Sequence, residues 1–249
     1  MRERLSAPAR GVGTKSSATD PVTDADRAAE AAIVSRLRAA RPDDEIVSEE
    51  GAGAGPGRTG LRWYVDPLDG TVNYLYGLPQ FSVVIACVDG TGALAGVVFD
   101  PSRDELFQAG RGGGAWLGDR RLRVREPASL SVSLVATGFS YLAEERAVQG
   151  RILAHLLPRV RDVRRLGSAA LDLAWVAAGR LDAYFESVSN PWDWVAGALV
   201  VTEAGGAVSE LAGTGGAPRL VASAPGLHGP LTGLLEDAVR TARVQTRQD

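Results

Sequence analysis

The pattern of apolar and polar positions divides the chain into a β-rich first half and a second half in which helices and strands alternate. Short apolar runs between turn residues are typical of strands. In the first half they predict strands at Glu45–Val47, Leu61–Val65, Phe81–Val88, Ala93–Asp100 and Glu105–Ala109, with Gly110–Gly114 and Leu117–Asp119 continuing the meander. Asp89-Gly90 gives the clearest hairpin signal. The glycine-rich segment 51–60 predicts an exposed loop.

One helix is predicted before these strands, from Asp24 to about Ala40. Thr23 is a good N-cap, Asp24 and Asp26 suit the first turn, and Pro42 follows the end. The residues before Gly13 are polar and show no hydrophobic period, so they predict no element.

The second half predicts an α/β arrangement. After a strand at Val132–Ala136, helices are predicted at Ala143–Leu157, Ser168–Ala178, Trp192–Ala204 and Leu227–Val244, and strands at Asp162–Arg165, Asp182–Glu186, Ala207–Glu210 and Arg219–Ala222. An antiparallel half joined to a mixed α/β half predicts stacked layers of helices and sheets. We expect two closely packed halves, residues 1–138 and 139–249.

Composition narrows the functional classes. The chain has 249 residues, 45% hydrophobic and 23% charged, which is typical of a globular protein with a sizeable core. Its net charge of −3 argues against a nucleic-acid partner. No apolar run approaches the roughly 20 residues of a membrane span, and no signal peptide is visible. These absences make a reducing, cytoplasmic setting the default expectation. Because the single cysteine, Cys87, lies in an apolar run, we expect a buried structural thiol.

The strongest local signal is the segment Val65–Tyr74, which reads VDPLDGTVNY. A short apolar strand delivers Asp66 at its end, and Pro67 removes a backbone donor and fixes a turn. Asp69 and the Leu68 carbonyl converge on the same point. Such hard oxygen ligands suit Mg²⁺ or Mn²⁺.

A short helix is predicted to begin near Thr71. The Gly70 and Thr71 amides at its N-terminus favour an anion such as phosphate. Carboxylates and phosphate repel each other, so the two features require cations between them. The alternative is an Asx turn in which Asp66 caps a helix.

Three further charged residues have two interpretations each. Glu49 follows a predicted strand, and taken alone it is typical of a solvated loop charge. Asp193 opens a predicted helix, where an acid usually serves as a cap or first-turn residue. Lys15, the only lysine, is either an exposed charge or a cation near a phosphate site.

These segments together resemble the inositol monophosphatase family. Asp66–Tyr74 resembles its first signature, and WDWVAGA at 192–198 with EAGG at 203–206 resembles its second. Glu49-Glu50-Gly51 lies where the family has its glutamate, and Lys15–Asp26 matches its N-terminal stretch. Residues 165–172 and 179–183 are similar to the bacterial inositol-1-monophosphatase branch. Relatives carry a long helix before the lysine segment, and the residues before Gly13 show no counterpart of it.

The resemblance implies a layered αβαβα fold and a role for each matching residue. Glu49, Asp66 and the Leu68 carbonyl would hold one Mg²⁺ ion. Asp66, Asp69 and Asp193 would hold a second, and Glu49 with water would hold a looser third. Thr71, hydrogen-bonded to Asp26, would position and deprotonate the attacking water. The implied substrate contacts are Lys15, Gly70, Thr71, Gly167, Ser168, Ala169 and Glu186.

The implied reaction is hydrolysis of inositol 1-phosphate or a similar phosphorylated polyol. Histidinol-phosphate phosphatase and fructose-1,6-bisphosphatase share the metal core and remain alternatives. A scaffold role in transcription or ribosome maturation, known for some relatives, is the alternative of another class. The family commonly forms dimers, so a homodimer is expected.

Overall fold

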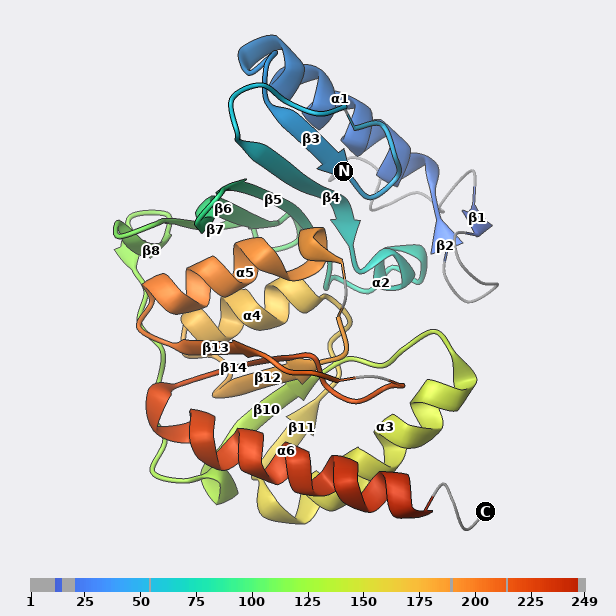
Figure 1. The fold of residues 1–249 in the computed structure, drawn as a ribbon, viewed down its shortest axis with the longest axis vertical. Coiled ribbons are helices and arrows are strands. Elements are labelled where there is room, and N and C mark those ends of the chain that lie inside the picture. Colours follow the sequence, from blue (N-terminus) through green and yellow to red (C-terminus); the bar gives the residue numbers. More distant parts are fainter. Residues whose placement is uncertain (1–11, 15–20, 54, 189, 214, 246–249) are drawn as a thin grey trace.

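The computed structural model describes residues 12–14, 21–53, 55–188, 190–213 and 215–245 of the chain. The elements stack in five layers (Figure 1), from helix α1 (Asp24–Ala40) at one end to helices α3 (Ala143–Leu156) and α6 (Pro225–Gln245) at the other. Two sheets lie between these ends, with helices α4 (Ala169–Ala177) and α5 (Pro191–Glu203) packed between them. The predicted αβαβα architecture is confirmed.

The first sheet contains seven strands in chain order. They are β3 (Glu45–Ser48), β4 (Arg62–Asp69), β5 (Ser82–Asp89), β6 (Gly92–Asp100), β7 (Glu105–Gly110), β8 (Gly114–Leu117) and β9 (Arg120–Arg121). From β4 onward every neighbouring pair is antiparallel, as the meander predicted. β3 and β4 instead run parallel, because residues 49–61 return the chain to the starting end of β3.

The second sheet is mixed and has the order β11-β10-β12-β14-β13. Its strands are β10 (Leu134–Thr137), β11 (Asp162–Arg164), β12 (Ala183–Glu186), β13 (Ala207–Glu210) and β14 (Leu220–Ser223). β10 is parallel to both of its neighbours, and the other two pairs are antiparallel. Since β10 belongs to this sheet, the chain leaves the first sheet before residue 138.

Small residues bring helix α5 close to both of its neighbours. A Cβ atom on Gly96 of β6 would lie 2.9 Å from the Cα of Ala196, and one on Gly197 would lie 2.7 Å from the Leu173 side chain. Glycine at both positions therefore allows α5 to pack closely between the first sheet and α4. This packing fixes the first turn of α5, which carries Asp193.

Helix α1 begins as predicted. The Thr23 hydroxyl accepts a hydrogen bond from the Ala25 amide, and Asp26 accepts one from the Thr23 amide at 2.9 Å, which makes a capping box. A two-stranded ribbon, β1 (Gly13–Thr14) with β2 (Pro21–Val22), precedes the helix. Lys15 and the residues before Val12 lie outside the described residues.

Two expectations about the chain as a whole concern Cys87 and membrane helices. The Cys87 thiol is buried, as predicted for a structural cysteine. Among the described residues, no helix combines the length and the apolar character that crossing a bilayer requires.

Candidate active site

The parallel pairing of β3 with β4 places Glu49 beside Asp66. Ser48, the last residue of β3, lies opposite Val65. The ladder continues one step further, because the Glu49 amide donates to the Val65 carbonyl at 3.1 Å. Glu49 and Asp66, which lie 17 positions apart in sequence, are therefore neighbours across the β3–β4 pair.

A β-bulge brings Asp66 and Asp69 to the same side of β4. The sequence predicted that this strand ends at Val65, but it continues to Asp69 with a shift in register. Asp66 pairs with Val84 and Asp69 with Ser82, so two residues of β4 oppose a single residue of β5. Pro67 has no N–H for the ladder, which makes this the point at which regular pairing fails.

Local hydrogen bonds fix the bulge. Asp66 Oδ1 accepts from the Leu68 amide at 2.8 Å, and the Leu68 carbonyl accepts from the Thr71 hydroxyl at 3.0 Å. Helix α2 (Thr71–Leu75) then begins, with Gly70 at its N-cap and φ of 93°. Asp66 thus forms the Asx-type turn of the alternative interpretation, but it does not cap the helix.

Thr71 also contacts helix α1. Its hydroxyl lies 3.0 Å from Asp26 Oδ1, the hydrogen bond that the family resemblance implied. Asp26 is completely buried, and its Oδ2 accepts from the amide and hydroxyl of Thr23. The Thr71 hydroxyl has one proton and two acceptors, Asp26 and the Leu68 carbonyl, so its oxygen lone pairs are directed elsewhere.

The two halves of the chain meet through a glycine contact. Asn73 Nδ2 donates to the carbonyls of Gln80 and Leu166, both at 2.7 Å. Gly70 and Gly167 both have φ above 90°, and a Cβ on Gly70 would lie 3.0 Å from the Gly167 carbonyl oxygen. Only glycine combines this backbone conformation with such a close approach.

Asp69 connects the bulge to the N-terminus of helix α4. Its carboxylate accepts from the Ser168 hydroxyl at 2.6 Å and from the amides of Ala170 at 2.9 Å and Ala169 at 3.3 Å. Ser168 is also the N-cap of α4. The Ser168 and Ala169 groups predicted to contact substrate therefore bind Asp69 in this structure.

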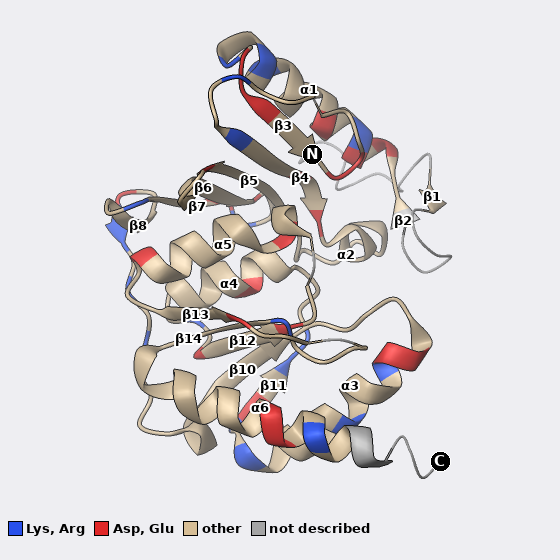
Figure 2. Cartoon of the chain, viewed as in Figure 1, with Lys and Arg blue, Asp and Glu red and all other residues tan. Residues whose placement is uncertain are grey.

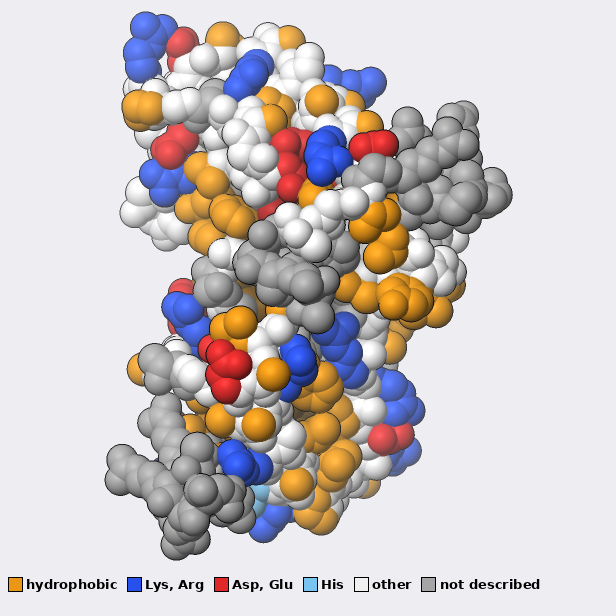
Figure 3. Space-filling model, turned by 90° about the vertical axis from the view of Figure 1, so that its right-hand side faces the viewer, with side chains coloured by type: hydrophobic (Ala, Val, Ile, Leu, Met, Phe, Trp, Pro, Cys, Tyr) orange, Lys and Arg blue, Asp and Glu red, His pale blue; other side chains and the backbone are white. Residues whose placement is uncertain are grey.

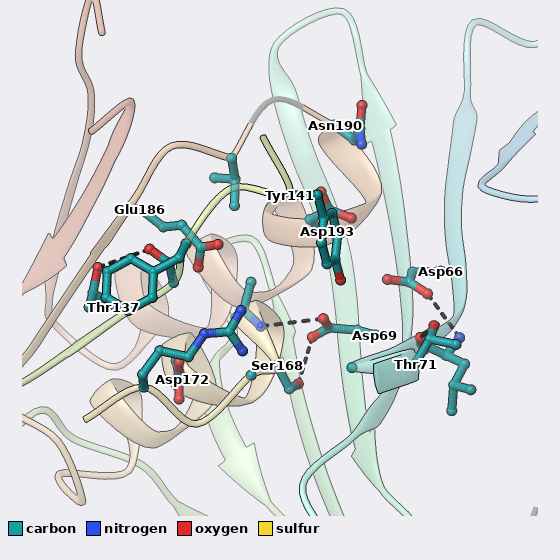
Figure 4. A pocket seen from close by; sticks show the side chains of 18 of the residues that line it. Asp66, Asp69, Thr71, Thr137, Tyr141, Ser168, Asp172, Glu186, Asn190 and Asp193 are labelled. Atoms are coloured by element: carbon teal, nitrogen blue, oxygen red, sulfur yellow. Dashed lines mark hydrogen bonds between the residues drawn. The ribbon is translucent and has the colours of Figure 1, made fainter. Parts of the chain in front are cut away.

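A pocket of about 260 Å³ collects most of the predicted site residues. Figure 4 shows Asp66 and Thr71 on one side of it and Glu186 and Thr137 on the other, with Asp69 and Asp193 between them. Acidic residues from β4, α4, α5 and β12 lie around the same region in Figure 2. The predicted residues that line the pocket are Glu49, Asp66, Leu68, Asp69, Gly70, Thr71, Gly167, Ser168, Ala169, Glu186 and Asp193.

The acids on the metal side of this pocket repel one another. Burial, followed by the charges of Glu49, Asp69 and Asp193, raises the pKa of Asp66 well above its usual range. Burial likewise raises the pKa of Asp69 to about 6, although the hydrogen bonds from Ser168 and Ala170 oppose that rise. Without a cation the group therefore holds protons that isolated carboxyls would lose.

The donor set fits Mg²⁺. Four carboxylates and one backbone carbonyl are all hard oxygen ligands, and they come from three different segments of the chain. In the part of the chain that the structure describes, no three acidic, histidine or cysteine side chains are already drawn into a metal-binding cluster. One reason is visible in Asp69, whose carboxylate faces the N-terminus of α4.

The loop after Glu49 is exposed, as predicted, but it is tied to helix α1. The buried Glu30 carboxylate accepts from the Ser48 hydroxyl and from the Glu50 amide, the latter at 3.0 Å. Arg38 donates to the carbonyls of Ala52 and Gly53. Helix α1 therefore holds the residues on both sides of Glu49, Ser48 by its hydroxyl and Glu50 by its amide.

Several pocket residues had no role assigned from the sequence. They are Thr137, Gly138, Phe139, Tyr141, Arg165, Asp172, Val188 and Asn190. Asp172 had a signal, since it is an acid in the otherwise apolar helix AALDLAWVA. Gly138 had none, because its importance depends on Glu186, 48 positions later, whose carboxyl atoms lie about 2.0 Å from where a Cβ on Gly138 would be.

Comparisons with known proteins identify the family of this chain. The inositol monophosphatase family model matches residues 1–246. Inositol-1-monophosphatase SuhB of Mycobacterium tuberculosis is 44% identical over 236 residues, covering 90% of this chain and 81% of the relative. Nus factor SuhB of Xylella fastidiosa is 47% identical over 202 residues, covering 81% and 72%.

Solved structures with a similar fold include relatives of the same kind. The extragenic suppressor protein suhB from Bartonella henselae matches with a TM-score of 0.84 and 38% identity, covering 96% of this chain and 90% of that one. The name Nus factor does not fit the expectation, drawn from net charge, that the chain has no nucleic-acid partner. The family model spans nearly the whole sequence, and this chain belongs to the inositol monophosphatase family.

Proposed function

We propose that this protein is a Mg²⁺-dependent phosphatase that hydrolyses inositol 1-phosphate or a similar phosphorylated polyol. The observation that carries the proposal is the meeting of Glu49, Asp66, Asp69 and Asp193 in one pocket, with the Leu68 carbonyl beside them. Glu49 follows β3, Asp66 and Asp69 belong to β4, and Asp193 belongs to α5. Gathering four acids in one pocket creates charge repulsion that bound cations would relieve. Family membership supports the same reaction.

The residues that would hold Mg²⁺ are those named from the resemblance. Glu49, Asp66 and the Leu68 carbonyl would hold one ion, and Asp66, Asp69 and Asp193 a second, with Glu49 contributing to a third. Bound Mg²⁺ supplies Lewis-acid chemistry, which neutralises the phosphate oxygens and lowers the pKa of water. Mn²⁺ has similar ligand preferences and is expected to substitute.

The chain itself would orient the nucleophile and the leaving group. The Thr71 hydroxyl donates a hydrogen bond to Asp26 or to the Leu68 carbonyl, which leaves an oxygen lone pair to accept a hydrogen bond from a water molecule. When that water loses a proton to Thr71, the hydroxyl proton of Thr71 would pass to the Asp26 carboxylate. On the opposite side, Glu186 accepts from the Tyr184 hydroxyl at 2.7 Å and so holds a fixed position. Its second oxygen would accept a hydrogen bond from a hydroxyl of a polyol.

A substrate panel tests the proposal. Purified protein in Mg²⁺ is assayed for phosphate release from inositol 1-phosphate, histidinol phosphate and fructose 1,6-bisphosphate. We expect the highest kcat/KM for inositol 1-phosphate, because Glu186 offers an acceptor to a hydroxylated ring. A preference for histidinol phosphate would select the amino-alcohol alternative instead, and no turnover of any of the three would refute the phosphatase.

A role in transcription is the second candidate, and the relatives named Nus factor favour it. On the face drawn in Figure 3, basic side chains are scattered among acidic and apolar ones and do not form a stripe. This face therefore offers no basic stripe of the kind that a nucleic-acid backbone would need. A variant without phosphatase activity separates the two roles, since a scaffold would keep its partner.

The pH dependence of Mg²⁺ binding gives an independent test. The pKa values of Asp66 and Asp69 are raised in the fold, so the metal-free native state binds more protons than the unfolded state from about pH 4 to 6. Stability of the metal-free protein should therefore fall as pH rises through this window. Because Mg²⁺ requires ionised carboxylates, its affinity should rise roughly tenfold per pH unit for each proton displaced.

Thermal unfolding measures this linkage. The rise in Tm that Mg²⁺ produces should be larger at pH 7.5 than at pH 5, whereas NaCl at equal ionic strength should give no such difference. Equal shifts at both pH values would show that Mg²⁺ acts by screening and not at these carboxyls.

The homodimer and the cytoplasmic location stay predictions. Both follow from the family resemblance and from the sequence, and the description of one chain tests neither. Sedimentation of the purified protein measures the first directly. The division into residues 1–138 and 139–249 is likewise a proposal about folding units.

A further inference from the structure

Asp172 is a buried acid without a hydrogen-bond partner for one of its oxygens. The residue is 1% exposed, and among the described residues its Oδ1 has no hydrogen-bond partner. An unpaired polar oxygen in such a place costs stability, and burial raises the pKa of this carboxyl well above its usual range. Helix α4 is otherwise apolar around it, so leucine would suit the packing better.

The position of Asp172 gives that oxygen a use. Asp172 lies one helical turn after Ser168, so both residues lie on the face of α4 that lines the pocket. Glu186 also lines this side, and its charge is close enough to affect Asp172. Arg165 lines the pocket as well. The wall opposite the proposed metal ligands therefore contains two acids, Asp172 and Glu186, and one cation, Arg165.

We propose that Asp172 is a specificity residue whose carboxyl accepts a hydrogen bond from a hydroxyl of the leaving group. The proposal rests on the proposed phosphatase function and adds a second acceptor to Glu186. Two acceptors on one wall would select leaving groups that carry more than one hydroxyl. Arg165 would donate to an oxygen of the same group, which a hydroxyl can accept while it donates.

The expected ligand is therefore a neutral polyol. Each hydroxyl of a polyol both donates and accepts, which matches a wall containing carboxyls and a guanidinium. A leaving group without hydroxyls would leave the oxygen of Asp172 buried and unpaired in the complex. The preference for hydroxylated substrates would then come from the cost of leaving the Asp172 oxygen unpaired and not from the shape of the pocket.

Two substrates that differ only in hydroxyl groups test the proposal. Glycerol 2-phosphate and propan-2-yl phosphate have the same branched carbon skeleton, but only the first carries free hydroxyls. We expect Asp172→Leu to lower the ratio of their kcat/KM values on the order of tenfold, the effect of one hydrogen bond. Asp172→Asn, which keeps an acceptor oxygen, should lower the ratio less.

Stability distinguishes this role from a structural one. Asp172→Leu should raise Tm, because it removes an unpaired buried acid. Asp182→Asn is the matched control: Asp182 is also 1% exposed but is bonded to Arg125 and the Leu134 amide outside the pocket. This control should lower Tm and leave the substrate ratio unchanged. An unchanged ratio in Asp172→Leu, or a lower Tm with equal losses on both substrates, would overturn the proposal.

The proposed function and this inference fail in different ways. If the wild-type protein releases phosphate from no substrate, the phosphatase is wrong. Calorimetric binding of inositol 1-phosphate in Mg²⁺, undisturbed by turnover, then tests Asp172 alone. Weaker binding by Asp172→Leu than by wild type would support the inference, and equal binding or none by wild type would reject it.

Discussion

Replacing Asp66 with asparagine is expected to lower turnover of inositol 1-phosphate by several orders of magnitude and to raise the Tm of the metal-free protein. Asp66 is 2% exposed, and Glu49, Asp69 and Asp193 all raise its pKa. Above the usual pKa of a carboxyl, keeping this group ionised or protonating it costs folding free energy, and a neutral amide of the same shape removes that cost. The same change removes the carboxylate proposed to bridge two ions, whose loss no remaining group replaces.

Phosphate release and thermal unfolding with and without Mg²⁺ measure both effects. The stabilisation by Mg²⁺ should disappear in Asp66→Asn. Asp100→Asn is the matched control, since Asp100 is completely buried but pairs with Arg103 and with the Ser102 amide away from the pocket. It should lose stability and keep turnover and the Mg²⁺ response. Turnover near the wild-type value in Asp66→Asn would refute the metal site.

The second large effect is expected at Thr71. Valine has nearly the same shape but no hydroxyl, so Thr71→Val removes the proposed proton acceptor without removing a metal ligand. General acid–base contributions of this kind are worth roughly 10²- to 10⁴-fold, and kcat should fall by such a factor. KM and the Mg²⁺-induced rise in Tm should change little.

Thr71→Ser is the informative comparison, because it keeps the hydroxyl and its hydrogen bond to Asp26. It should retain most of the wild-type kcat. Asp26→Asn should resemble Thr71→Val, since an amide cannot take a proton from the hydroxyl. If valine and serine reduced kcat equally, packing of the Thr71 methyl group and not its hydroxyl would be responsible.

The secondary structure was predictable because most elements have strong local signals. The N-cap at Thr23 and the short apolar strands around Asp89-Gly90 are read from neighbouring residues alone. The Val65–Tyr74 segment likewise predicted a turn with two acids at fixed spacing. The bulge was not predicted, because it depends on the register of β4 against β5, which only the completed sheet defines.

Other features depend on residues that are distant in sequence. Gly138 is informative only beside Glu186, and Glu30 only beside the backbone of Glu50. Asp172 could be recognised as unusual in an apolar helix, but its missing partner is visible only in the folded chain. Tertiary contacts thus decide which acids share a pocket, and local patterns do not contain that information.

The hydrogen bonds that Asp69 accepts from Ser168 and Ala170 have a consequence for ligand binding. A cation that binds the Asp69 carboxylate would change these hydrogen bonds and with them the position of the first turn of α4. Asp172 lies on the same helix, one turn further along. Cation binding at Asp69 would therefore change the free energy with which the Asp172 side of the pocket binds a leaving group. Such linkage is reciprocal: if the cation raises the affinity for a polyol by some factor, the polyol should raise the affinity for the cation by the same factor.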